Sequence, residues 1–162
     1  MSTDPERNGR WRRLLARTDE VRAAVDSADP HRCPDAVVGA LHALYDAWEL
    51  WTQRAQLKTH AAADQRVEDQ PDGELVAALI HARGGTTHSP FVEFGHFTDT
   101  ISDSYFQHYG CWRWQSHSDP TPRFATRDSW YATHVAHREV LPVLEAAVAW
   151  LQQQPEIAAP KR

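Results

Sequence analysis

The stretch ELVAALIHARGGTTH, residues 74–88, joins an apolar helical pattern to a polar cluster. Apolar residues recur in its first half at steps of three and four, as Leu75, Val76, Leu79 and Ile80. This spacing predicts a helix with one buried face. The second half carries His81, Arg83 and His88 around a pair of glycines. Such a cluster is typical either of a chemical site or of an ordinary helix end, because glycine and basic residues both favour helix C-termini.

Further segments with helical periodicity place this stretch inside a bundle. We predict other helices over about residues 9–27, 34–62, 129–135 and 142–153. Asp29 and Pro30 separate the first two of these, and Pro71 suits the first turn of the helix that contains residues 74–88. The sequence therefore predicts an all-α fold, an antiparallel bundle of four to five helices in a single domain.

Other parts of the chain carry weaker patterns. Residues 61–73 are polar and contain a proline, which predicts a turn. Residues 89–127 are rich in aromatic side chains, and we expect short helical or irregular pieces there, followed by a short extended run at residues 111–115. We expect disordered tails at residues 1–9 and 155–162.

The composition limits the class of protein. A chain of 162 residues with 41% hydrophobic residues suits one domain with one core. The net charge of -5 argues against a globally basic nucleic-acid binder, although a local basic site remains compatible with it. Two cysteines do not form a disulfide framework. No segment resembles a signal peptide or reaches the length of a membrane span, and we therefore expect a cytoplasmic protein.

Arg83 and His88 together could perform phosphoryl chemistry on RNA. An imidazole titrates near neutral pH, so it can take a proton from a ribose 2′-hydroxyl or give one to the leaving 5′-oxygen. A guanidinium stays charged and matches the geometry of a phosphate. In a regular helix, residues five positions apart diverge by roughly 140°. The two side chains therefore converge only if Gly84 and Gly85 distort the helix, or if a second copy of the chain completes the site.

The sequence ARGGTTH, residues 82–88, at the end of an apolar helix resembles the Arg-x4-6-His motif of the HEPN superfamily. The resemblance implies a metal-independent endoribonuclease without a cofactor, acting as a homodimer whose two Arg/His pairs face each other. It implies that Arg83 contacts the phosphate and that His88 is the acid–base residue. Some members are toxins or antiphage effectors, so an antitoxin or another protein partner is also implied. The family usually carries a polar residue after the arginine, where this chain has Gly84, and a non-catalytic dimerisation module therefore stays open.

Four further residues are expected to contact the RNA substrate: His81, Thr87, Arg54 and Lys58. Two other pairs match the same spacing, Arg54 with His60 and Arg127 with His134. We prefer Arg83 and His88 because they follow the apolar run.

A His-rich metal site is a second alternative. His134 and His137 have helical ligand spacing with Glu139 nearby, and His81, His88 and His96 form another conceivable group. Our first expectation remains a site without metal. No nucleotide-binding glycine motif or nucleophile elbow occurs in the sequence.

Overall fold

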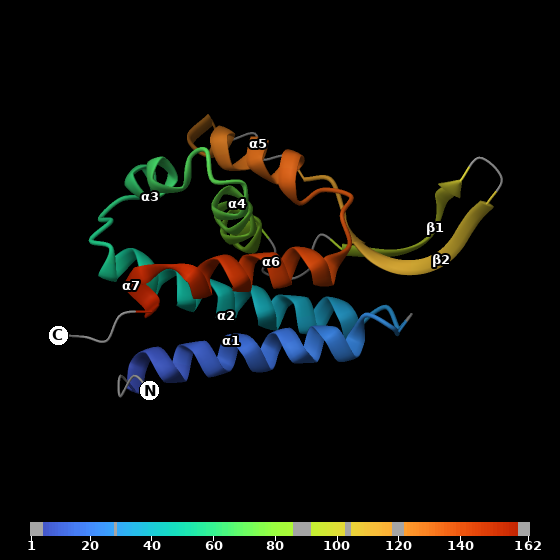
Figure 1. The fold of residues 1–162 in the computed structure, drawn as a ribbon, viewed down its shortest axis with the longest axis horizontal. Helices are drawn as coiled ribbons and strands as arrows, with labels where there is room; N and C mark the ends of the chain where they lie inside the picture. Colours follow the sequence, from blue (N-terminus) through green and yellow to red (C-terminus); the bar gives the residue numbers. More distant parts are fainter. Residues whose placement is uncertain (1–4, 28, 86–91, 103–104, 118–121, 159–162) are drawn as a thin grey trace.

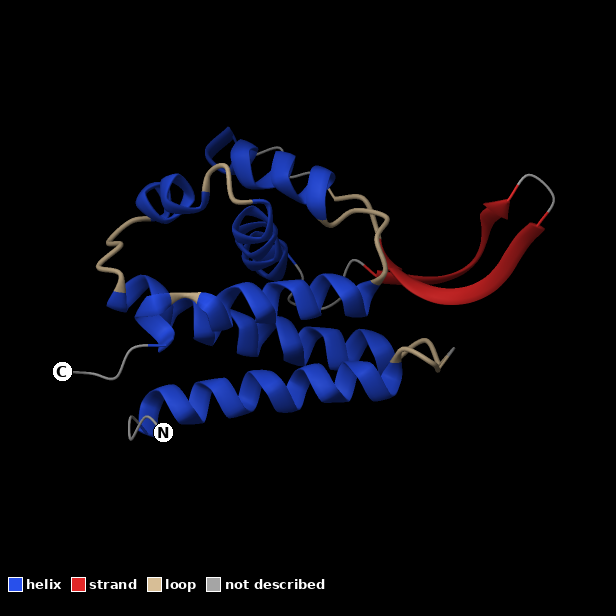
Figure 2. Cartoon of the chain, viewed as in Figure 1, coloured by secondary structure: helices blue, strands red, loops and turns tan. Residues whose placement is uncertain are grey.

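The computed structural model describes residues 5–27, 29–85, 92–102, 105–117 and 122–158. Within these residues the protein is mainly α-helical, as the periodicity predicted, with one antiparallel hairpin that the sequence analysis did not predict (Figures 1 and 2). One hydrophobic cluster joins the helices. No helix among the described residues is long and apolar enough to cross a membrane.

Helices α1 (Pro5–Ala24) and α2 (Arg32–Arg54) lie side by side along one side of the molecule (Figure 1). Leu14 and Val21 bury the apolar stripe of α1. The first half of α1 is rich in arginine. One of these residues, Arg13, forms an ion pair of 2.8 Å with Asp46 on α2. Helix α1 begins at Pro5, so residues 5–9, expected to be part of a loose tail, are helical.

The single helix predicted over residues 34–62 is wrong, because the chain turns after Arg54 and starts a new helix, α3 (His60–Val67). Gln56 takes a left-handed backbone conformation with φ 58°. The Thr59 side chain then accepts a hydrogen bond of 3.1 Å from the Ala62 amide. This is an N-cap that starts α3. Most of the turn predicted over residues 61–73 is therefore helical.

Helix α4 (Pro71–Gly85) lies in the middle of the molecule, between α5 (Ala125–His134) and the pair formed by α2 and α6 (Val140–Gln153) (Figure 1). Its residues from Leu75 to Ile80 are all buried, on every face of the helix. A helix that is apolar all round needs neighbours on every side. Its last turn, with Arg83, reaches the boundary between core and surface.

Strands β1 (Val92–Ser102) and β2 (Tyr105–Trp114) form the hairpin, and its far end projects beyond the helices (Figure 1). The extended run expected at residues 111–115 is largely the end of β2, whereas the irregular pieces expected before it are wrong. The buried end of β2 is fixed to the helical body, because the Trp114 amide donates to the Arg138 carbonyl at 3.0 Å and the Trp112 indole donates to the Ser27 carbonyl at 2.7 Å.

The C-terminal part closes the core. Helix α6 runs to Gln153, and a short helix, α7 (Pro155–Ala158), follows it where we expected the start of a disordered tail. Ile157 is buried against the core, which explains why α7 is held in place. The Trp51 ring lies 5.2 Å from that of Trp150, and its indole donates to Glu156 at 3.3 Å. These contacts tie α2, α6 and α7 together.

Candidate functional site

Arg83 lies in the last turn of α4 and faces α2. Its guanidinium carbon lies 4.0 Å from the centroid of the Tyr45 ring, which is a cation–π contact. Its Nε–H donates a hydrogen bond of 3.2 Å to Nδ1 of His42. Because Nδ1 accepts, the His42 ring carries its proton on Nε2 in this arrangement. An arginine and an imidazole are thus brought together between two helices that are far apart in the sequence.

The two α2 residues that hold Arg83 belong to a longer polar stripe. His42, Tyr45, Glu49 and Thr52 follow one another at steps of three and four, which places them on one side of α2. We call these four residues the α2 stripe. A hydrogen bond with Glu49 is the main cause that raises the pKa of Tyr45 above its ordinary value, while the positive charge of Arg83 lowers it. The stripe therefore connects Arg83 electrostatically with the rest of α2.

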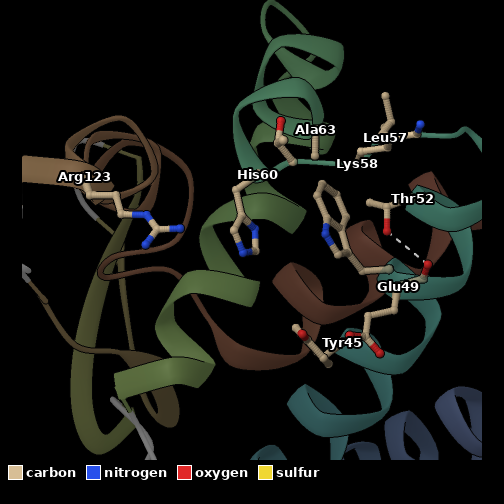
Figure 3. Close-up of a pocket in the computed structure, with 10 residues that line it drawn as sticks. Tyr45, Glu49, Thr52, Leu57, Lys58, His60, Ala63 and Arg123 are labelled. Carbon is tan, nitrogen blue, oxygen red and sulfur yellow. Dashed lines mark hydrogen bonds between the residues drawn. The ribbon is translucent and has the colours of Figure 1, made fainter.

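A pocket of about 450 Å³ lies along the stripe, between α2, α3 and the short 3-10 turn Pro122–Phe124 (Figure 3). Tyr45 lines the pocket and also carries Arg83, so the two features share a residue. Lys58, His60 and Arg123 contribute basic or titratable groups to the wall, and Glu49 is the carboxylate among the lining residues. A pocket with two fixed positive charges and an aromatic wall suits an anion that carries a flat ring.

The other residues predicted to contact substrate fall into different places. Lys58 lines the pocket. Arg54 is directed toward α7, where its Nη1 donates to the Glu156 carbonyl at 3.4 Å. His81 contacts the side chain of Phe124, with 4.9 Å between ring centroids, and so faces α5 rather than α2. His88 and Thr87 lie outside the described residues.

The Arg127/His134 match is divided between two separate contacts, an ion pair and a hydrogen bond. Arg127 is 4% exposed and its Nε donates to Asp64 at 2.7 Å. His134 instead lies 2.7 Å from Glu74, a carboxylate in the first turn of α4. These contacts link α5 to α3 and to α4, so both residues have an evident role in packing.

The metal group considered around His134 is also divided. His137 contacts the Ser116 hydroxyl at 2.8 Å through Nε2, whereas His134 contacts Glu74. In the described part of the chain, the group of three ligands that comes together is a different one, formed by His81, His117 and Asp128.

Sequence reasoning assigned no role at this site to His42, Tyr45 and Arg123, and it named His60 only in a spacing match with Arg54. The spacing of the α2 stripe was a usable signal, because polar groups at steps of three and four along one line of an otherwise apolar helix indicate a polar contact. No signal linked Arg123 to this site, since its position depends on the fold of residues far along the chain.

Comparison with known proteins found no matching family model, no similar curated protein and no similar solved structure.

Proposed function

We propose that this protein is a metal-independent endoribonuclease of the HEPN type, with Arg83 as the phosphate-binding residue. The observation that supports the proposal best is the position of Arg83, which lies at the end of α4, held by Tyr45 and His42 next to the pocket of the α2 stripe. A guanidinium stacked on an aromatic ring keeps its planar set of N–H donors in one orientation. Bidentate binding of a phosphate requires those donors in a defined orientation.

The proposed chemistry assigns one task to each group. Arg83 binds the scissile phosphate and stabilises the additional negative charge that develops on it. His88 moves the proton, from the 2′-hydroxyl or to the 5′-oxygen. Lys58 and Arg123 bind neighbouring phosphates of the strand from the pocket wall. This assignment explains how a chain with a net charge of -5 could still hold RNA locally.

His42 enters the proposal as a positioning residue. It contacts Arg83 at 3.2 Å and is exposed, so it controls the orientation of the guanidinium from the rim of the site. Its removal should weaken catalysis without abolishing it, because the contact of Arg83 with Tyr45 remains.

The proposal includes a homodimer, and a toxin–antitoxin or antiphage role remains part of it. A dimer would allow a second copy to complete a site in which Arg83 and His88 diverge along one helix. Size-exclusion chromatography with light scattering measures the mass directly, and a monomer at every concentration would remove this part of the proposal.

The test is an RNA cleavage assay in EDTA on the wild type, Arg83→Ala and His88→Ala, with the fold checked by circular dichroism. We expect Arg83→Ala to lose about 10²- to 10³-fold in initial rate, the loss typical of a group that stabilises transition-state charge. We expect His88→Ala to lose about 10²- to 10⁴-fold, the contribution typical of a general acid or base. Matched controls are Arg22→Ala, an exposed arginine paired with Glu145, and His31→Ala, an exposed histidine before α2. Both controls should cleave at the wild-type rate.

Two outcomes contradict the proposal. One is the absence of cleavage by the folded wild type on a broad panel of RNAs, which would favour a non-catalytic dimerisation module. The other is cleavage that Arg83→Ala and His88→Ala retain in full, which would place the active site elsewhere or reveal a contaminating nuclease.

A further inference from the structure

We propose that His81, His117 and Asp128 form a binding site for a divalent transition-metal ion of the zinc class. One possible ligand atom from each residue lies within 4.8 Å of those of the other two. All three side chains are half-buried. The residues come from positions 36 and 11 apart in the sequence, so the fold, and not a short motif, brings them together.

Three different elements supply the ligands. His81 lies on α4, one turn before its end, and Asp128 lies in the first turn of α5. His117 follows β2 in the segment that leads toward α5. Helices α4 and α5 pack against each other, which fixes the distance between His81 and Asp128. An ion at this point would join the hairpin side of the molecule to both helices.

The three residues that precede His117 are held by hydrogen bonds. The Tyr131 hydroxyl donates to the Gln115 carbonyl at 3.0 Å, and Ser116 contacts His137 at 2.8 Å. Before them, the Trp114 carbonyl accepts from the His137 amide at 2.8 Å. A metal ligand on an anchored segment is already close to its bound position, so binding costs little ordering of the chain.

The walls of the site are aromatic. The Phe124 ring lies 4.9 Å from that of His81, and the Tyr131 ring meets that of His117 edge-on at 5.9 Å. Phe124, Asp128 and Tyr131 recur at steps of four and three, so this face of the α5 region presents one carboxylate between two rings. Tyr131 is fully buried, so little water reaches this side of the cluster. Such a shell strengthens the attraction between a cation and its ligands.

The donor set indicates the class of ion. Two imidazole nitrogens and one carboxylate suit Zn²⁺ and its neighbours Co²⁺, Ni²⁺ and Fe²⁺ better than Ca²⁺ or Mg²⁺, which prefer oxygen. A tetrahedral zinc with bonds of about 2.0 Å places its ligand atoms about 3.3 Å apart, so the side chains would move closer on binding. Three protein ligands leave a position for water or a small anion.

This site is separate from the proposed ribonuclease site, although both use the end of α4. Residues two positions apart on a helix point about 200° apart. Arg83 accordingly contacts α2, and His81 contacts the region around α5. Metal binding can therefore be tested without RNA, and its failure leaves the ribonuclease proposal untouched.

The test uses tag-free, EDTA-dialysed wild-type protein, titrated with Zn²⁺ in a calorimeter and with Co²⁺ in a spectrophotometer. We expect one equivalent of each ion to bind, with visible Co²⁺ absorption of a low-symmetry site with nitrogen and oxygen ligands. We also expect saturating Zn²⁺ to raise the melting temperature, because an ion that binds only the folded state stabilises it.

Three variants locate the ion: His81→Gln, His117→Ala and Asp128→Asn. Each should bind Zn²⁺ at least about 100-fold more weakly, the upper end of the effect seen when even an outer partner of a metal site is removed. His31→Ala and Asp72→Asn change exposed residues of the same types and should bind as the wild type does. Asp128→Asn keeps the shape of the side chain, so its folded state can be compared directly with the wild type.

Two results overturn the proposal. If the folded wild type binds neither ion in the micromolar range or tighter, the three residues form only a polar cluster within the protein. If the wild type binds but all three variants keep its affinity and its Co²⁺ spectrum, the ion lies elsewhere.

Discussion

The two sides of the last turn of α4 differ in the way they hold their polar groups. On the side of α2, Arg83 lies against the Tyr45 ring and donates a hydrogen bond to His42, next to an open pocket. On the side of α5, His81 lies among rings and half-buried ligands supplied by three elements. We propose that the first arrangement binds a large anionic ligand and that the second binds a small ion. One buried helix thus supports both proposed sites.

The largest effect should come from a substitution in the core of α4, the helix that supports both proposed sites. Leu79 is fully buried on α4, and Leu79→Ala should lower the free energy of unfolding by about 2–5 kcal/mol through lost contacts and a cavity. Urea denaturation measures the loss. Leu15→Ala is the matched control, since Leu15 is 41% exposed and should change stability by less than about 0.5 kcal/mol. We expect RNA cleavage and Zn²⁺ binding to weaken together as Leu79→Ala unfolds. An equal effect of both substitutions would contradict the buried position of α4.

A smaller loss should affect mainly the α5 side. Asp64→Ala leaves the Arg127 guanidinium buried without this carboxylate and should cost about 2 kcal/mol of stability. Because Arg127 precedes Asp128, the start of α5 should loosen and Zn²⁺ affinity should fall more than RNA cleavage does. Asp64→Asn keeps an acceptor oxygen and should cost less. If cleavage fell as much as metal binding in the folded Asp64→Ala variant, the two sides of α4 would not be independent.

The α2 side can be tested by a conservative change. Arg83→Lys keeps the charge but loses the planar fork and its stacking on Tyr45. We expect the initial rate of RNA cleavage to fall about tenfold, which corresponds to about 1.4 kcal/mol. Zn²⁺ affinity should not change, because Arg83 lies away from the three ligands. Full activity in Arg83→Lys would show that only charge matters at this position, and Arg22→Lys provides the matched control.

The smallest effect should come from the ring beneath Arg83. Tyr45→Leu removes the cation–π contact and should lower the cleavage rate by about two- to fivefold, equivalent to about 0.5–1 kcal/mol. Tyr45→Phe keeps the ring and loses only the hydrogen bond with Glu49, so it should have the smaller effect. The measurement compares the cleavage rates of Tyr45→Leu and Tyr45→Phe. If Tyr45→Phe were the slower variant, the hydroxyl of Tyr45 and not its ring would support Arg83.

Local sequence patterns predicted those helix boundaries that depend on residues close together in the chain. The start of α4 at Pro71 and the end of α6 at Gln153 are confirmed, because proline placement and apolar periodicity act within a few residues. The break after Arg54 was missed, since the apolar pattern continues through it while Gln56 turns the backbone. The hairpin was missed as well, because pairing of β1 with β2 is decided between strands and its sequence lacks a strong turn signal.

The candidate sites likewise contain residues that a local motif can single out and residues that only the tertiary structure brings together. The motif that singled out Arg83 lies within seven residues of the sequence. The roles of Arg83 and His88 both stay predictions. The partners of Arg83 on α2 and the cluster around His81 required the tertiary structure. His117 and Asp128 are 11 residues apart and belong to no ligand motif, so composition and spacing could not pair them.

The buried thiol of Cys33 can be used to measure local opening of the native protein. Cys33 is fully buried in the first turn of α2, and burial raises the pKa of its thiol to about 12. Alkylating reagents react with the thiolate, so near pH 8 this sulfur is protected twice, by lack of access and by its proton. Cys111 on β2 is only half-buried. Labelling should therefore proceed in two phases, and the slow phase measures how often the start of α2 opens in the native protein.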